Sequence, residues 1–145
     1  MKISTRGRYG LRAMIDLCMH AQGEYISLRS IAKRQCLSSG YLEGIFAALK
    51  KAGLVRGAAG SCGGYLPALP ADQITIRMIL EPLESSMSLL DGPENGGASS
   101  LRSFLNREVW SKVDRAVAGL LDATTVADLM REFENRDRAV DSSSL

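Results

Sequence analysis

Residues 26–66 read ISLRSIAKRQCLSSGYLEGIFAALKKAGLVRGAAGSCGGYL, and this stretch decides the fold. Ser27 and Ser38 each stand directly before apolar residues at helical spacing, and serine is a favoured N-cap residue. Gly53 follows the second run, as glycine commonly does at the end of a helix. Two short helices joined by residues 35–37 predict a helix-turn-helix over about residues 27–52, although a helical hairpin within a bundle shares this pattern.

The residues after Gly53 favour the helix-turn-helix over the bundle. Residues 54–56 are a strand candidate, residues 57–64 form a glycine-rich turn, and Tyr65 and Leu66 begin a second strand. A hairpin directly after the second helix is typical of a wing, here over about residues 54–69. The predicted fold class is mainly α, with a winged helix-turn-helix DNA-binding domain over residues 1–84 and a long C-terminal dimerisation helix.

Helical periodicity extends on both sides of this stretch. A first helix is predicted over about residues 7–21, and Thr75 opens a fourth helix that Pro82 ends near Glu81. Residues 85–103 are rich in Ser, Gly and Asn and predict a flexible loop. A long helix over about residues 105–121 and a short last helix capped by Thr125 make up residues 104–134. Residues 135–145 are predicted to be a disordered tail.

The long helix carries a wide apolar stripe. One small domain cannot easily cover both its own core and this stripe, which favours a homodimer; packing against the first helix of the same chain is the alternative. The predicted interface residues are Val109, Trp110, Val113, Val117, Leu120 and Leu121.

Charge is distributed unevenly along the 145 residues. Residues 1–60 hold ten Lys and Arg against three acids, hence +7, whereas residues 61–145 hold eight against thirteen, hence −5. The split predicts a polyanionic partner for the first part, unless it is a chance imbalance on solvated faces. No apolar run approaches the ~20 residues of a membrane helix. Charged residues near the N-terminus interrupt any secretory segment, so we expect a cytoplasmic protein without a membrane partner.

The cysteines and the histidine exclude several classes of protein. Cys18, Cys36 and Cys62 are odd in number and widely spaced, which excludes a disulfide scaffold and a four-thiolate metal site within one chain. Cys18 is expected to be a small buried residue, whereas Cys36 and Cys62 are candidate redox switches, with simple space-filling as the alternative. An enzyme is not expected, because residues 60–64 lie between two strands and His20 is the only histidine.

Seven segments carry a resemblance over about residues 1–130: MKISTRGRYGLRAM (1–14), SLRSIA (27–32), LSSGYLE (37–43), LKKAGLV (49–55), GGYL (63–66), VW (109–110) and LDATT (121–125). Together they resemble the Rrf-two family of bacterial winged-helix transcription regulators. That family includes the iron–sulfur cluster regulator, the cysteine-metabolism repressor and the nitric-oxide-sensing repressor. The resemblance implies a homodimer that crosses over through the long helix, with recognition helices in adjacent major grooves ~34 Å apart.

The resemblance also implies which side chains contact double-stranded DNA. Hydroxyl and carboxylate groups on the third helix suit base edges and phosphates. Lys and Arg suit phosphates as a set, although each lysine taken alone is more often a solvated surface charge. The predicted DNA-contacting residues are Lys2, Thr5, Ser38, Ser39, Tyr41, Glu43, Lys50, Lys51, Arg56 and Ser61. The expected function is sequence-specific regulation of transcription, as a repressor.

Three departures limit what the resemblance carries over. Gly44 stands where relatives often have Gln, and Ala59 stands where relatives insert a wing-tip Arg, so no operator sequence carries over. Cluster-binding relatives place three cysteines before the long helix, but residues 91–109 contain neither Cys nor His. The last Cys-x-x-His of those relatives falls on Ser103 and Asn106, which are poor iron ligands.

No cofactor and no metal site are therefore expected. Two alternatives stay open: a cluster-sensing regulator whose ligands have been mutated, and a regulator that acts through a protein partner such as a metabolic enzyme.

Overall fold

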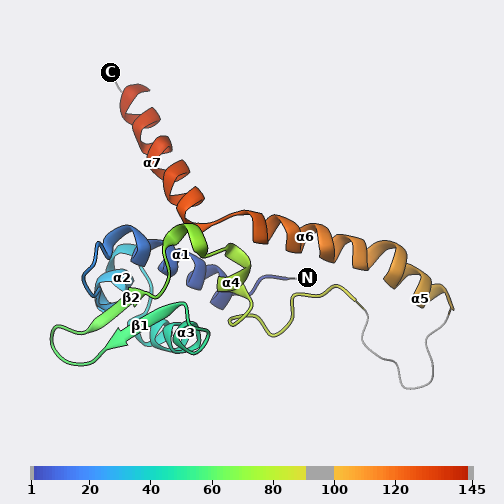
Figure 1. Ribbon diagram of the computed structural model, residues 1–145, viewed down its shortest axis with the longest axis horizontal. Coiled ribbons are helices and arrows are strands. Elements are labelled where there is room, and N and C mark those ends of the chain that lie inside the picture. Colours follow the sequence, from blue (N-terminus) through green and yellow to red (C-terminus); the bar gives the residue numbers. More distant parts are fainter. Residues whose placement is uncertain (1, 91–99, 144–145) are drawn as a thin grey trace.

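The computed structural model describes residues 2–90 and 100–143, and it shows a body from which two helical segments project (Figure 1). The elements of the body are α1 (Thr5–His20), α2 (Leu28–Gln35), α3 (Ser39–Lys51), β1 (Val55–Ala58), β2 (Gly64–Pro67), η1 (Ala71–Gln73) and α4 (Ile76–Leu80). The C-terminal elements are α5 (Ser100–Leu105), the π turn η2 (Asn106–Trp110), α6 (Ser111–Ala123) and α7 (Val126–Ser143). We call Ser100–Ala123 the arm.

The two helices of the helix-turn-helix begin at their predicted caps. Ser27 Oγ accepts a hydrogen bond from the backbone N–H of Ser30 (3.2 Å), and Ser38 Oγ accepts one from that of Tyr41 (3.3 Å). Gly53 follows α3 with φ of +80°, a backbone conformation that residues with side chains rarely adopt. The predicted starts of both helices and the predicted end of α3 are confirmed.

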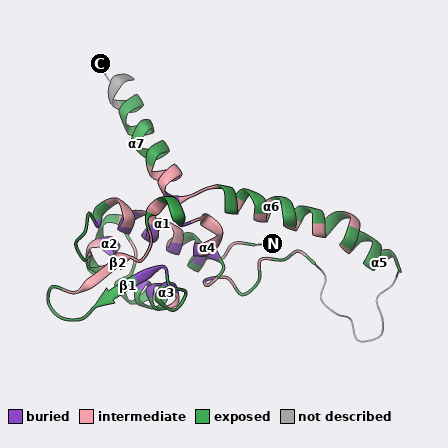
Figure 2. Ribbon diagram, viewed as in Figure 1, coloured by how far each residue is buried: buried purple, intermediate pink, exposed green. Residues whose placement is uncertain are grey.

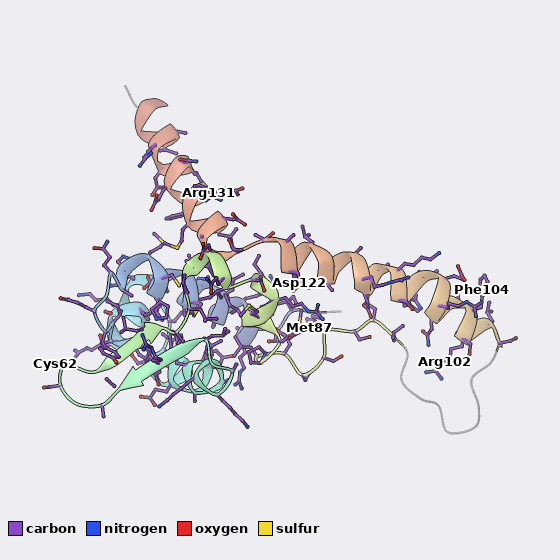
Figure 3. All side chains as sticks on the ribbon, in the orientation of Figure 1. Cys62, Met87, Arg102, Phe104, Asp122 and Arg131 are labelled. Carbon is purple, nitrogen blue, oxygen red and sulfur yellow. The ribbon has the colours of Figure 1, made fainter. Side chains whose placement is uncertain are left out.

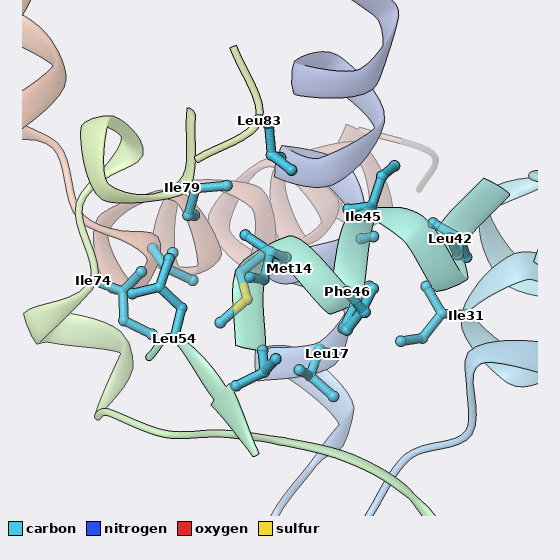
Figure 4. Close-up of a cluster of buried hydrophobic side chains, with 14 of the residues drawn as sticks. Met14, Leu17, Ile31, Leu42, Ile45, Phe46, Leu54, Ile74, Ile79 and Leu83 are labelled. Carbon is cyan, nitrogen blue, oxygen red and sulfur yellow. The ribbon is translucent and has the colours of Figure 1, made fainter. Parts of the chain in front are cut away.

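The core lies where α1, α3 and the hairpin meet, and buried residues concentrate there (Figures 2 and 4). Phe46 is fully buried, and its ring centroid lies 4.9 Å from that of Tyr65 on β2. Each fully buried side chain of this size contributes about 1.5–3 kcal/mol. The inner faces of α1 and α3 supply Met14, Leu17, Leu42, Ile45, Phe46 and Leu49.

The hairpin is attached to the body through the segment before α2. β1 and β2 pair antiparallel, with Gly57 opposite Tyr65. On its other edge Tyr65 exchanges two backbone hydrogen bonds with Ile26, of 2.8 and 2.9 Å. The Ile26 carbonyl oxygen lies 2.3 Å from the position that a Cβ on Gly64 would take, so only glycine fits there. This contact sets the position of the wing relative to the helix-turn-helix.

The arm joins the body at its C-terminal end. The backbone N–H of Val126 donates to the Ile74 carbonyl (2.8 Å), and Val126 is fully buried. Thr125 caps α7 as predicted: its Oγ1 accepts from the Asp128 N–H (3.1 Å), and the Asp128 carboxylate accepts from the Thr125 N–H (3.0 Å). From this junction the arm and α7 project in different directions (Figure 1).

The structure corrects two predicted boundaries. Helix begins at Ser100, inside the predicted loop of residues 85–103, because Leu101, Phe104 and Leu105 continue the helical spacing of the arm. α7 continues to Ser143, where the sequence predicts a short helix and a disordered tail from residue 135. Good helix formers and Glu–Arg pairs four residues apart support such a helix without burial. Residues 91–99 of the predicted loop and 144–145 of the predicted tail lie outside the described residues.

Candidate nucleic-acid interface

The outer face of α3 carries polar side chains that are exposed to solvent. Ser39, Tyr41 and Glu43 are exposed, and Tyr41 is 42% accessible. Nothing lies within 4 Å of a Cβ built on Gly44, so the face stays open at this position. Ser38 is also exposed, but its oxygen caps α3, which leaves its hydroxyl proton to donate to a ligand. Hydrogen-bonding groups of this kind can contact base edges and phosphates.

The start of α1 adjoins the start of α3. The rings of Tyr9 and Tyr41 meet edge to face, with centroids 5.7 Å apart and planes at 80°. Thr5 lies one turn before Tyr9 and is exposed, which places it on the side of α1 that adjoins α3. Lys2 is exposed in the segment before α1.

The wing adjoins the other end of α3. Lys50 and the wing residues Gly57 and Ala59 line a shallow groove of about 340 Å³. Ser61 and Cys62 are exposed at the wing tip, where Figure 3 labels Cys62. Lys50 at the end of α3 thus adjoins the wing, whereas Ser61 and Cys62 at the tip line a separate groove with Ser30 and Arg34 of α2.

Arg56 is not brought to this surface. Alternate residues of a strand face opposite sides, and Gly57, the next residue, faces Lys50. Arg56 instead lines a separate groove of about 320 Å³ with Cys18 and Leu66. The predicted contact through Arg56 therefore requires its long side chain to reach around the edge of the hairpin.

Several cations of the body are free to meet a polyanion. The structure describes no hydrogen bond or ion pair for the side chains of Lys2, Arg6, Arg29, Lys33, Lys50, Lys51 and Arg56 among the residues it covers. Arg8, Arg12 and Arg34 differ, because each donates a hydrogen bond to a group within the body. The positive charge of residues 1–60 is thus largely unpaired, and a surface of this kind attracts phosphate.

A buried carboxylate that the sequence analysis missed lies behind this surface. Asp16 of α1 is 2% exposed and accepts hydrogen bonds from Arg34 Nε (2.9 Å), Arg34 Nη2 (2.7 Å) and Gln35 Nε2 (2.8 Å). Burial acts to raise the pKa of Asp16, but these hydrogen bonds and the charges of Arg34 and His20 outweigh it and lower the pKa below its ordinary value. The sequence offered one signal for this buried carboxylate, because Asp16 lies between the apolar residues Ala13 and Leu17, which are both buried.

The three thiols lie in separate parts of the body. Cys18 packs against the core, and burial raises the pKa of its thiol to about 11, as expected for an unreactive residue. Cys36 and Cys62 are exposed at the α2–α3 turn and at the wing tip. Their redox role stays a prediction.

Comparison with known proteins assigns the fold to a family. The family model for Rrf2, described as an iron-dependent transcriptional regulator, matches residues 3–132. The chain belongs to the Rrf2 family. It is 41% identical over 140 residues to the transcriptional regulator CymR of Bacillus subtilis, covering 96% of each chain. This membership makes the chain a DNA-binding regulator of transcription and not an enzyme, and the predicted mainly α, winged-helix fold is confirmed.

Solved structures of Rrf2-family proteins share the fold. The structure of B. subtilis CymR, titled the global cysteine regulator, matches with a TM-score of 0.76 and 38% identity, over 91% of this chain and 98% of that one. IscR of T. potens matches with a TM-score of 0.75 and 38% identity, over 94% and 90%.

The donor residues of this chain do not fit the iron that the family description names. The residues that the structure describes contain no group of three or more His, Cys, Asp or Glu placed to hold a metal ion. Residues 91–109 contain neither Cys nor His, so the arm offers no thiolate or imidazole at its start. Within residues 2–90 and 100–143, no helix is both long and apolar enough to span a membrane.

Proposed function

We propose that the chain is a homodimeric, sequence-specific repressor that binds double-stranded DNA in the cytoplasm. One observation carries this proposal: the polar outer face of α3 lies beside unpaired lysines and a glycine-rich wing on one uncovered surface. A helix with this exposure fits the major groove. Repression needs no further activity, because a dimer bound at a promoter excludes the polymerase.

The contacts divide into two kinds by their chemistry. Ser39, Tyr41 and Glu43 present hydroxyl and carboxylate groups that distinguish base edges. Lys50, Lys51 and the backbone amides of residues 60–63 suit phosphates, which set position and affinity without reading sequence. Gly44 adds no side-chain contact, so base reading falls mainly on the first turn and a half of α3.

The exposed apolar side chains of the arm support dimerisation. No residue of α5, η2 or α6 is buried, although this arm carries large apolar side chains. Leu101 is 65% exposed and Leu120 is 67% exposed. Val109, Trp110 and Val113 are 37–38% exposed on the same arm, whereas Val117 and Leu121 are partly covered by the body. An apolar surface of this length marks a site of association. The arm of a second copy of the chain carries the same apolar stripe and can cover this one.

In-vitro selection of duplexes from a random library, followed by binding across a salt series, tests the proposal. The wild type should enrich a roughly palindromic sequence. Lys50→Ala with Lys51→Ala should weaken binding to all duplexes alike and flatten the slope of log affinity against log salt by up to about two. Lys112→Ala, an exposed lysine on α6, is the matched control and should leave the slope unchanged. Failure of the wild type to enrich any sequence would overturn direct readout and favour action through a protein partner.

We also propose that the repressor works without an iron–sulfur cluster. The proposal rests on the missing thiolates and imidazoles at the start of the arm. Anaerobic reconstitution with iron and sulfide should leave the protein colourless and its DNA affinity unchanged. A stable brown protein with bound iron and sulfide would contradict it.

A further inference from the structure

Asp16 connects α1 to the end of the first helix of the helix-turn-helix. Asp16 is the one buried charged residue in the described part of the chain. Its partners Arg34 and Gln35 are the last two residues of α2, directly before the turn that leads to α3. The two parallel bonds from Arg34 fix direction as well as distance, as a guanidinium–carboxylate pair does.

Arg12 makes a second connection one turn earlier on α1. Arg12 Nη2 donates to the Gln35 carbonyl (2.6 Å), and the guanidinium lies 5.5 Å from the ring centroid of Tyr9. Tyr9 in turn contacts Tyr41 in the first turn of α3. Residues of α1 therefore contact both sides of the α2–α3 turn.

The α2–α3 turn is held locally by a hydrogen bond from the Leu37 N–H to the Ala32 carbonyl (2.9 Å), by the Ser38 cap and by packing of Leu37 on the core. It spans residues 36–38, and Cys36 adopts the left-handed conformation (φ 56°, ψ 46°) that side chains disfavour. We infer that Asp16 and Arg12 are positioning residues, which hold the α2–α3 turn against α1 and so set the angle at which α3 meets base edges. This inference rests on the proposed function.

Specific and non-specific binding to DNA depend on different features of the body. Non-specific binding depends on cations that contact phosphates, whereas specific binding also depends on the orientation of α3 in the groove. Asp16→Asn removes a negative charge, so electrostatics alone would strengthen binding to every duplex. A loss of binding confined to the selected duplex must therefore come from geometry.

The test compares the duplex selected by the wild type with a scrambled duplex of the same composition. Asp16→Asn should lower the ratio of the two affinities about tenfold, the order expected for loss of one hydrogen-bonded charged pair. Arg34→Lys keeps the charge but loses the two-pronged geometry, and should lower the ratio in the same direction. Asp72→Asn is the control, because Asp72 is exposed on η1 and has no hydrogen bond within the described residues.

Circular dichroism first establishes that each variant is folded at the assay temperature. An unchanged ratio in folded Asp16→Asn and Arg34→Lys would overturn the inference while leaving the proposed function standing. Equal losses on both duplexes would also overturn it, since they indicate weaker phosphate contacts in general rather than a changed orientation of α3. No selection by the wild type would overturn the proposed function and this inference with it.

Discussion

The winged body and the arm differ in how their apolar side chains are covered. Among the residues whose burial the structure describes, the buried hydrophobic ones lie between Ala13 and Leu83, except Val126 at the junction with α7. The arm buries none of its residues, and Phe104 is 49% exposed near its far end (Figure 3). A segment that closes its own core is stable alone, whereas an uncovered apolar helix needs a second surface. The contrast is what the proposed function predicts, with DNA contact by the body and dimerisation through the arm.

Replacing a phenylalanine by alanine in each region should give the largest difference in the free energy of unfolding. Phe46→Ala should lower the free energy of unfolding by about 3–5 kcal/mol, because a fully buried ring leaves a cavity. Phe104→Ala should cost less than about 1 kcal/mol in protein diluted to the monomer. Urea unfolding followed by circular dichroism measures both. Equal losses would show that the arm is covered within its own chain.

Placing charged residues in the apolar stripe of the arm should prevent dimerisation without unfolding the body. Val113→Glu combined with Leu120→Glu should give a folded monomer in sedimentation, because two charges cannot be buried unpaired. Its affinity for the selected duplex should fall about a hundredfold, since the two half-sites no longer reinforce each other. Lys112→Glu, which lies beside the stripe, should remain dimeric. A dimer that survives both stripe substitutions would move the interface elsewhere.

Acid should weaken the body through Asp16. The pKa of Asp16 is lowered in the folded chain, so its stabilisation is complete above the ordinary value of about 3.9 and is lost as pH falls through the folded value. Asp16→Asn should be less stable than the wild type by about 2 kcal/mol at neutral pH. The difference should shrink below about pH 4. A difference that stays constant down to pH 2 would show that the charge of Asp16 adds nothing.

The smallest expected effect is a gain in stability at the α2–α3 turn. Cys36 has φ of 56°, and glycine adopts this conformation without the steric cost that a side chain incurs. Cys36→Gly should raise the free energy of unfolding by about 0.5–1 kcal/mol. Cys62→Gly at the wing tip, where φ is not positive, should give no gain. Equal effects at the two positions would show that backbone strain is not the cause.

The sequence predicted those parts of the fold whose signals lie within a few residues of one another. Ser27, Ser38, Thr75 and Thr125 cap helices as predicted, because each hydroxyl accepts from an N–H three residues ahead. The exposed face of α3 followed from the same periodicity. The start of α5 and the extension of α7 beyond residue 134 did not, since these parts of the two helices are not buried within the chain.

Contacts between distant residues were decided only by the tertiary structure. The residues next to Asp16 in the sequence do not indicate that Arg34 is its partner. Likewise, the residues next to Gly64 do not indicate that the Ile26 carbonyl excludes a side chain there. The side on which Arg56 leaves the wing likewise depends on how the hairpin packs on α3. The sequence by itself therefore determined the helices of the body, the helix caps and the resemblance to the family. The three-dimensional structure decided how α1 and the wing pack around α3, because hydrogen bonds and steric exclusion depend on proximity in space rather than along the chain.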